Sequence, residues 1–281
     1  MVVHVDLVAD VLRLEEQMIM KAVMEWARVR LVNLEEEALP LGRINADAAI
    51  IRPISMHRAL YAASSYEASM VFTVNTSSTI LYAGDKMLSY TRLIAHQIPV
   101  PKTYYASTPT AAAKAGAELG YPLVIKSPIG SWGRLVVRAK TPEKLAEFSE
   151  LRRMLPCIQQ RTLILQEYLE INNTDIRCVV VDGELVGCVA RKARRGEWRS
   201  NVALGAATKP YPVDTELEDL AIKAASALKG FFVSVDIFET KSHGYLVNEV
   251  NGVPEFKGFM KATGKNPAAE LSVKLYHKLH Q

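Results

Sequence analysis

Two lysines of the sequence stand where a positive charge needs a partner. Lys126 lies inside the apolar run YPLVIKSP, and Lys86 follows Gly-Asp at the expected start of a helix. A lysine on a buried strand costs free energy unless an anion meets it. Two such point charges could neutralise adjacent phosphates of a nucleotide. The alternative is a lysine whose stem covers apolar surface while its ammonium stays in water, and it suits Lys126 less than a typical lysine.

A glycine-rich loop separates two expected strands and consists of Gly130, Ser131, Trp132, Gly133 and Arg134. Two glycines allow unusual backbone dihedral angles and close approach of the main chain to a ligand. Successive N–H groups in such a loop can hold a phosphate. The loop is not a Walker motif, because no Lys-Ser/Thr pair and no helix follow it. A plain hairpin turn is the alternative.

Three oxygen-bearing side chains are expected to converge on two late strands. Glu249 and Asn251 are two residues apart on YLVNEVNG, so their side chains leave the same face, and Asp236 interrupts the apolar strand FFVSVDIFET. If the strands pair, two carboxylates and one amide oxygen meet. Such hard oxygen ligands suit Mg²⁺ held against phosphates. A set of acids on a solvent-exposed sheet edge is the alternative, and the apolar flanks argue against it.

Two further segments end strands. The basic run from Arg191 to Arg195 offers guanidinium groups that fit carboxylate and phosphate oxygens. Arg191, nearest the strand, is the candidate catalytic residue that would stabilise a phosphoryl transition state. The rest of the run is either a solvated loop or an attraction for an acidic protein segment. Gln166, Glu167 and Tyr168 end another strand, where backbone groups could pair with an adenine edge; a plain strand end is the alternative.

The elements that must position these groups follow from periodicity and turn residues. Strands and helices alternate over residues 2–75, which predicts a small parallel sheet. A helix over 84–97, two helices that begin at Thr108-Pro109 and Thr141-Pro142, and the strands beside the glycine loop predict a small central αβ module. Val-Asp-Gly-Glu at 181–184 marks a hairpin that opens an antiparallel sheet with helices. The predicted fold is α/β, in part α+β, with three domains at 1–85, 86–165 and 166–281.

Composition excludes several classes of protein. A net charge of +4 over 281 residues is too small to argue for nucleic acid. Cys157, Cys178 and Cys188 form no C-x-x-C pair, so we expect neither a disulfide nor a zinc site but buried thiols in a reducing compartment. No signal peptide or membrane-length apolar run is found, which predicts a cytoplasmic protein. The absence of G-x-G-x-x-G argues against a Rossmann dinucleotide site.

Taken in order, these motifs resemble the ATP-grasp superfamily over nearly the whole chain. More narrowly, RPISMHRALY, PIGSWGRL, QEYLE, DIRCVVV, EWRSNVALGA and VNEVNGVPEFKGF resemble the LysX/ArgX family of ligases, which act on the amino-group carrier protein LysW. The resemblance implies an ATP-grasp fold behind a parallel N-terminal domain, with ATP and two Mg²⁺ ions as cofactors. One departure is Asn172-Asn173-Thr174, where relatives often carry a turn with lysine and glycine.

The resemblance also implies roles for particular residues. ATP would contact Lys86, Lys126, the loop 130–134, residues 166–168, Arg177 and Asn201. Magnesium would contact Asp236, Glu249 and Asn251. The amino-acid substrate would contact Arg191, Val202, Ala203, Glu255, Phe256, Lys257, Gly258 and Phe259.

The reaction that the family implies joins a carboxylate to an amine. ATP phosphorylates the side-chain carboxylate of the carrier's C-terminal glutamate, and an amino acid then attacks the acyl phosphate. One branch takes glutamate for arginine biosynthesis and the other takes α-aminoadipate for lysine biosynthesis. The resemblance assigns Gly258-Phe259 to the glutamate branch, whose sequences carry Gly-Phe where the other branch carries Asn followed by Ser or Thr. A bulky Phe259 would shorten the substrate pocket and favour the shorter glutamate side chain by about 1–3 kcal/mol. Phe259 as a core residue is the alternative.

Other functions stay open at this point. They are ligation of α-aminoadipate or of both amino acids, another glutamate or peptide ligase, and a non-catalytic ATP-binding protein. We expect the acidic carrier LysW and glutamate as partners, a homo-oligomer (dimer or tetramer), and neither nucleic acid nor membrane.

Overall fold

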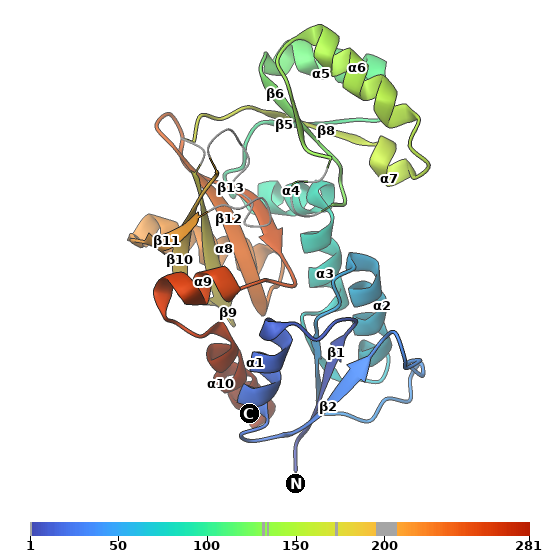
Figure 1. The fold of residues 1–281 in the computed structure, drawn as a ribbon, viewed down its shortest axis with the longest axis vertical. Helices are drawn as coiled ribbons and strands as arrows, with labels where there is room; N and C mark the ends of the chain where they lie inside the picture. Colours follow the sequence, from blue (N-terminus) through green and yellow to red (C-terminus); the bar gives the residue numbers. More distant parts are fainter. Residues whose placement is uncertain (1, 131–132, 134, 172–173, 195–206) are drawn as a thin grey trace.

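The computed structural model describes residues 2–130, 133, 135–171, 174–194 and 207–281. Three β-sheets follow one another along the chain, and helices cover them (Figure 1). The predicted mixed α/β architecture is therefore confirmed, with one parallel sheet and two antiparallel ones.

The N-terminal sheet is parallel, in the order β2-β1-β3-β4. Its strands are β1 (His4–Ala9), β2 (Arg28–Asn33), β3 (Ala48–Ile51) and β4 (Phe72–Val74). Both faces are buried, as in parallel sheets generally. Val5 and Leu7 pack in a core with α1 (Leu14–Val23), whereas Val8 and Ile51 pack in a second core with α2 (Met56–Glu67). The predicted parallel unit is confirmed.

Two consecutive helices, α3 (Ser77–Gly84) and α4 (Lys86–Ala95), lead into the middle sheet. The sequence predicted a single helix over 84–97 and missed α3. The two helices are separate because Asp85 adopts an extended conformation between them. Its side chain accepts hydrogen bonds from the N–H groups of Met87 (2.9 Å) and Leu88 (3.1 Å), so Asp85 caps α4 and fixes Lys86 at its first turn.

The middle sheet is antiparallel, in the order β5-β8-β6-β7. Its strands are β5 (Thr103–Ala106), β6 (Leu123–Lys126), β7 (Val137–Ala139) and β8 (Leu163–Glu167). Its helices are α5 (Pro109–Leu119), α6 (Pro142–Arg153) and the short α7 (Ile158–Arg161). Thr108 and Thr141 cap α5 and α6, each followed by proline, as predicted. The sequence missed β5, and the predicted domain boundary at 165/166 falls inside β8.

The C-terminal sheet is antiparallel, in the order β11-β10-β9-β12-β13. Its strands are β9 (Thr174–Val181), β10 (Glu184–Lys192), β11 (Ala207–Tyr211), β12 (Phe232–Thr240) and β13 (Gly244–Asn251). Asp182 and Gly183 both have positive φ (46° and 77°), which gives the predicted tight turn between β9 and β10. The helices are α8 (Thr215–Ala227), α9 (Lys257–Thr263) and α10 (Pro267–Leu279).

The two faces of this sheet are buried by different helices. α8 packs in one core with Ile176 and Val180 of β9. On the other face, Val179 of β9 shares a core with Leu271 of α10 and with Val5 of the N-terminal sheet. The N-terminal and C-terminal sheets therefore share one core, and α1 lies beside α10 (Figure 1).

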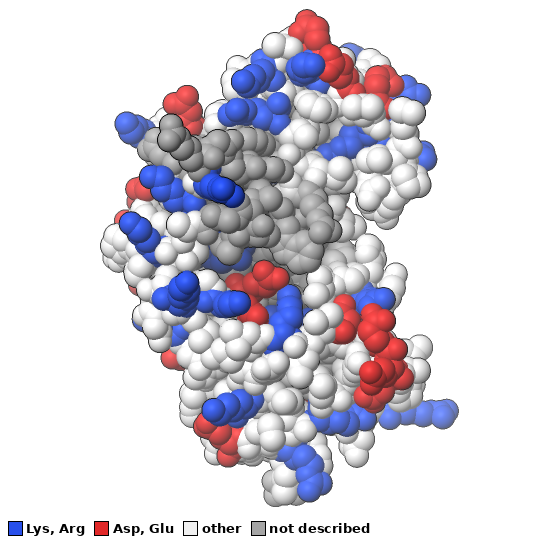
Figure 2. Space-filling model, in the orientation of Figure 1, with Lys and Arg blue, Asp and Glu red and all other residues white. Residues whose placement is uncertain are grey.

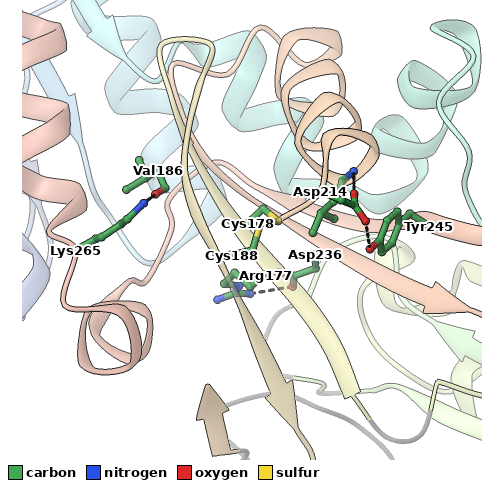
Figure 3. The surroundings of a disulfide bond; sticks show 9 residues. Arg177, Cys178, Val186, Cys188, Asp214, Asp236, Tyr245 and Lys265 are labelled. Atoms are coloured by element: carbon green, nitrogen blue, oxygen red, sulfur yellow. Dashed lines mark hydrogen bonds and ion pairs between the residues drawn. A yellow bond between two sulfur atoms is a disulfide. The ribbon is translucent and has the colours of Figure 1, made fainter. Parts of the chain in front are cut away.

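The expectation of free thiols is wrong for two of the three cysteines. Cys178 and Cys188 are buried as predicted, but they form a disulfide between β9 and β10 (Figure 3). A bulge between Leu185 and Gly187 shifts the register by one residue and brings Cys188 opposite Cys178. An unbroken hairpin would turn Cys188 to the other face, so sequence spacing alone hides the pairing. Cys157 is free and exposed.

Acidic and basic side chains are interspersed over the face shown in Figure 2. Among the helices of the described ranges, none has the length and apolar character needed to cross a bilayer.

Candidate active site

A cleft of about 520 Å³ receives side chains from the middle sheet, from the C-terminal sheet and from loops and helices of the N-terminal part. The middle sheet supplies Val124, Lys126 and Gln166, and the C-terminal sheet supplies Arg177, Arg191, Asp236, Glu249 and Asn251. The N-terminal part supplies Arg13 and residues 53–57. Most of the residues singled out from the sequence, though far apart along the chain, therefore line one cavity.

Lys126 is buried at the end of β6, as its place in an apolar strand predicted. Its Nζ donates to Gln166 Oε1 (2.6 Å) and Asn248 Oδ1 (2.8 Å), and lies 3.4 Å from Tyr90 Oη. Burial lowers the pKa of Lys126 to about 7, and the attraction of Glu249 offsets this only in part. The ammonium has neutral hydrogen-bond acceptors but no carboxylate within ion-pair distance among the described residues, so an incoming anion would stabilise it.

Lys86 lies on the other side of the glycine loop. Its Nζ donates to the carbonyl of Gly130 (2.6 Å) and is 3.4 Å from Glu249 Oε1. Gly130 and Gly133 have φ of 155° and 70°, which are conformations that favour glycine, and both residues line the cleft. At Gly130 the loop therefore brings a main-chain carbonyl to Lys86, and its role in holding phosphate stays a prediction.

Arginines and carboxylates alternate across one face of the C-terminal sheet. Arg191 lies opposite Asp175, Arg177 opposite Asp236, and Asp236 opposite Glu249 in the strand pairings. Arg191 donates to Asp175 from Nε (2.7 Å) and Nη2 (2.5 Å), and its Nη2 also meets Asp236 Oδ2 (2.8 Å). Arg177 binds both oxygens of Asp236 (2.8 and 2.9 Å; Figure 3).

This arginine–carboxylate cluster, made of Asp175, Arg177, Arg191 and Asp236, fixes the charge states of its members. Burial raises the pKa of Asp236, but the two guanidinium groups outweigh it and hold that pKa at about 2. Burial alone would lower the pKa of Arg191, whereas Asp236 and Asp175 raise it. Asp236 and Arg191 are therefore both ionised, and the cluster places two arginines against two aspartates.

Asp236, Glu249 and Asn251 meet at the cleft, and their chemistry fits a magnesium ion. Asp236 Oδ1 accepts a hydrogen bond from Arg177 (2.8 Å), and a carboxylate oxygen has a second lone pair that a metal ion could use. Glu249 is partly exposed and its nearest cation is Lys86. The buried Nδ2 of Asn251 has no hydrogen-bond partner within the described part of the chain, and rotating the amide would present its oxygen instead. No cluster of three His, Cys, Asp or Glu side chains offers another metal site in the described ranges.

The remaining predicted ATP contacts lie along β8 and beyond. Gln166 Nε2 donates to Tyr90 Oη (2.9 Å) and to Thr103 Oγ1 (3.0 Å). Glu167 pairs its N–H with the carbonyl of Lys102 (3.0 Å), and its carboxylate accepts from the N–H of Lys102 (2.6 Å). Glu167 and Tyr168 both line the cleft. Ser131, Trp132, Arg134, Asn201, Val202 and Ala203 lie outside the described residues.

The predicted substrate segment 255–259 reaches the cleft at one residue only. Glu255 lines it, whereas Phe256 and Phe259 are buried in the core shared with α10. The main-chain N–H of Lys257 donates to Glu15 (3.1 Å), and the carbonyl of Gly258 accepts from Thr208 (3.3 Å). The proposed direct contact between Phe259 and a substrate gains no support from this placement, because the ring packs near Gly187.

Three residues with evident roles at the cleft were missed from the sequence. Tyr90 is one helical turn after Lys86, and its hydroxyl donates to the carbonyl of Asn248 (2.8 Å), so i,i+4 spacing could have indicated it. Asn248 is the extra residue of a bulge between Asp236 and Ile237, which lets it share the cleft with Glu249. Buried Arg152 donates to Ser127 Oγ (2.5 Å) and to the carbonyl of Leu135, and so joins both ends of the glycine loop.

The fold and this site define an ATP-grasp protein. Residues 83–275 match the model of the RimK-like ATP-grasp domain, so the chain belongs to that family. A RimK-domain ATP-grasp protein from Sphaerobacter thermophilus has the same fold, with a TM-score of 0.76 at 24% identity over 97% of this chain and 99% of the other. The chain is, as predicted, an ATP-dependent carboxylate–amine ligase.

Closer relatives place it within the LysX/ArgX group. It is 44% identical to the glutamate–LysW ligase ArgX of Sulfolobus acidocaldarius, over 95% of this chain and 96% of the relative. It is 35% identical to the α-aminoadipate–LysW ligase LysX of Sulfurisphaera tokodaii, over 82% of this chain and 80% of the relative. The family predicted from the sequence is confirmed.

Proposed function

We propose that this chain joins the amino group of glutamate to the side-chain carboxylate of the C-terminal glutamate of LysW, through an acyl phosphate. The observation that carries the proposal is the cleft itself. One cavity holds a lysine without a paired carboxylate, a three-oxygen set suited to Mg²⁺, and arginines already oriented by carboxylates. The greater identity to the glutamate–LysW ligase supports glutamate over α-aminoadipate.

In this proposal, the basic residues of the cleft bind phosphates and the acidic residues and Asn251 bind Mg²⁺. Lys86 and Lys126 would hold the ATP phosphates, and the main chain at Gly130 and Gly133 would approach them. Asp236, Glu249 and Asn251 would hold Mg²⁺, which supplies charge neutralisation at the transferring phosphoryl group. Two ions are part of the proposal. Positioning and neutralisation are sufficient for such a transfer, so no nucleophile on the protein is needed.

Arg191 would act on the acyl phosphate and on the carboxylate of the incoming amino acid. Its Nε and Nη2 already bind Asp175, which fixes the plane of the guanidinium group. A guanidinium held in this way stabilises developing negative charge without reorganising. The amino group of glutamate then attacks the acyl carbon, and inorganic phosphate leaves.

A carrier-charging assay tests the proposal. Purified enzyme, ATP, Mg²⁺ and LysW are incubated with glutamate, with α-aminoadipate, or with both, and LysW is analysed by mass spectrometry. We expect a glutamate adduct, with ADP formed only when LysW is present. Preferential formation of the adduct heavier by one methylene group would contradict the substrate assignment. ADP formation without LysW would indicate another acceptor. Light scattering of the same sample tests the proposed homo-oligomer.

A further inference from the structure

The cleft extends past the lysines to the topological switch point of the N-terminal sheet, between β1 and β3. In the order β2-β1-β3-β4, the chain leaves β1 toward β2 on one side and leaves β3 toward β4 on the other. Loops that diverge from the carboxyl ends of neighbouring parallel strands open a crevice, and α/β proteins bind ligands there. In this protein the two loops supply Arg13 and residues 53–57 to the wall of the cleft.

Arg13 is the cationic side chain of this crevice, and its partners differ in exposure. Its Nε and Nη2 donate to Glu16 (3.0 and 2.9 Å), which is fully buried. Buried Arg52 donates from Nε to the same carboxylate (2.9 Å), so Glu16 accepts hydrogen bonds from two guanidinium groups. Arg13 Nη1 donates to Glu255 (3.0 Å), whose side chain is 45% exposed. Glu255 therefore occupies a position that an incoming carboxylate could take.

Exposed apolar side chains flank Arg13 along the chain, and one more, Ile54, lines the same cleft. Val11, Leu12, Leu14 and Ile54, which we call the apolar rim, are each at least 40% exposed. The N–H of Ile54 donates to Asp10 (3.0 Å), which joins the two loops that carry them. Exposed apolar groups beside a charged pocket are typical of surfaces that bind a protein. A polypeptide tail can place apolar side chains on this rim together with a carboxylate on Arg13, whereas free glutamate has no apolar side chain that could contact the rim.

We infer that Arg13 binds the α-carboxylate of the C-terminal residue of the acceptor polypeptide, while the apolar rim contacts the residues before it. This inference rests on the proposed function, in which the side-chain carboxylate of that residue is phosphorylated. The two carboxylates of one residue are then separated along the cleft. The reacting carboxylate faces the lysines and Glu249, and the other carboxylate replaces Glu255 on Arg13.

The test couples a change in the enzyme to a change in the acceptor. Wild type and Arg13→Gln are each assayed with LysW that has a free C-terminal α-carboxylate and with LysW that ends in a carboxamide. We expect amidation to lower kcat/KM for wild type about tenfold, as for the loss of a hydrogen bond to a charged group. Arg13→Gln should lose about tenfold with free LysW and nothing more with amidated LysW. KM for ATP and for glutamate should not change.

A second variant, Glu255→Gln, should strengthen binding of LysW instead of weakening it. Glu255→Gln removes the competing carboxylate, so KM for LysW should fall about twofold or more, and this variant keeps the test decisive if Arg13→Gln does not fold. Equal losses on amidation in wild type and Arg13→Gln, or an effect of Arg13→Gln on KM for glutamate instead, would overturn the inference. Failure of wild type to charge free LysW at all would instead reject the proposed function.

Discussion

The cleft contains two kinds of positive charge, and they are held differently. Lys126 donates to the neutral oxygens of Gln166 and Asn248, and burial lowers its pKa to about 7. Arg177 and Arg191 instead bind carboxylates through two nitrogens each. Among the described residues, Lys126 therefore has no carboxylate within ion-pair distance, and the ion pair of the lysine end joins Lys86 to Glu249 (3.4 Å). The arginine end instead places two guanidinium groups against two carboxylates.

This difference suggests separate roles, with Lys126 binding an incoming anion and Arg191 presenting a guanidinium group whose direction is already fixed. An anion can reach Lys126 without displacing a counter-ion, so the free energy of the contact is available for holding a phosphate. An anion at Arg191 meets a group whose direction Asp175 already fixes. Removal of a charge should therefore destabilise the fold at the arginine end and weaken nucleotide binding at the lysine end.

The largest expected effect comes from Asp236→Asn. This change leaves buried Arg191 and partly buried Arg177 with one carboxylate between them, so the free energy of unfolding should fall by about 3–5 kcal/mol. Ligase activity should fall at least about 100-fold, because a proposed magnesium ligand is lost as well. Denaturant unfolding and ADP release measure the two effects. Glu239→Gln, an exposed change on the same strand, should stay within about 0.5 kcal/mol of wild type. Wild-type stability of Asp236→Asn would show that the cluster is not structural.

The disulfide should stabilise the arginine end of the cleft and leave nucleotide binding at the lysine end unchanged. Cys178 is adjacent to Arg177 on β9, and Cys188 lies on β10, the strand that carries Arg191. Replacing both cysteines by alanine should lower the free energy of unfolding by about 2–4 kcal/mol, without changing KM for ATP. Thermal unfolding with and without reductant measures this, and Cys157→Ala is the control. A rise in KM for ATP would show that the two ends are coupled.

Lys126→Met should give the reverse pattern. KM for ATP should rise about tenfold to 100-fold, since hydrogen bonds to a charged group are lost. The free energy of unfolding should change by less than about 1 kcal/mol, because the cost of burying the ammonium disappears along with its hydrogen bonds. Initial rates and thermal unfolding test both statements, with exposed Lys140→Met as control. Strong destabilisation would place Lys126 among the structural charges.

The smallest effect is a pH dependence of nucleotide binding. Phosphate raises the pKa of Lys126 above its free value of about 7, so binding takes up a proton above pH 7 and none well below it. KM for ATP should be constant below about pH 6 and rise about tenfold between pH 7 and 8.5. Lys126→Arg, which stays protonated, should abolish this rise. A flat profile in wild type would mean that Lys126 is fully charged in the free enzyme.

Local patterns in the sequence predicted those parts of the site that regular strands and helices carry. Glu249 and Asn251 converge with Asp236 because a two-residue spacing places side chains on one face and the strands pair as expected. Lys126 was identifiable because a lysine in an apolar strand departs from the pattern. The Thr-Pro starts of α5 and α6 are likewise local signals.

Irregular strand pairing and long-range contacts made other parts of the site unpredictable from the sequence. The bulge at Val186 brings Cys188 opposite Cys178, and the bulge at Asn248 turns a residue toward Lys126 that alternation assigns to the opposite face. Arg13 and Arg152 depend on contacts between elements far apart in the chain, and no sequence spacing encodes them. The choice between a pocket position and a core position for Phe259 also depends on long-range packing, and its ring lies in the core shared with α10.

The core shared by the N-terminal and C-terminal sheets has a consequence for biosynthesis. One face of β1 belongs to the same core as side chains of α10, which the ribosome produces after the three sheets. Until α10 emerges, Val5, Leu7 and Ile50 lack part of their cover, and exposed apolar strands of this kind favour aggregation. A nascent chain stalled before Pro267 should therefore be bound by chaperones and cleaved by proteases, and release of α10 should end both.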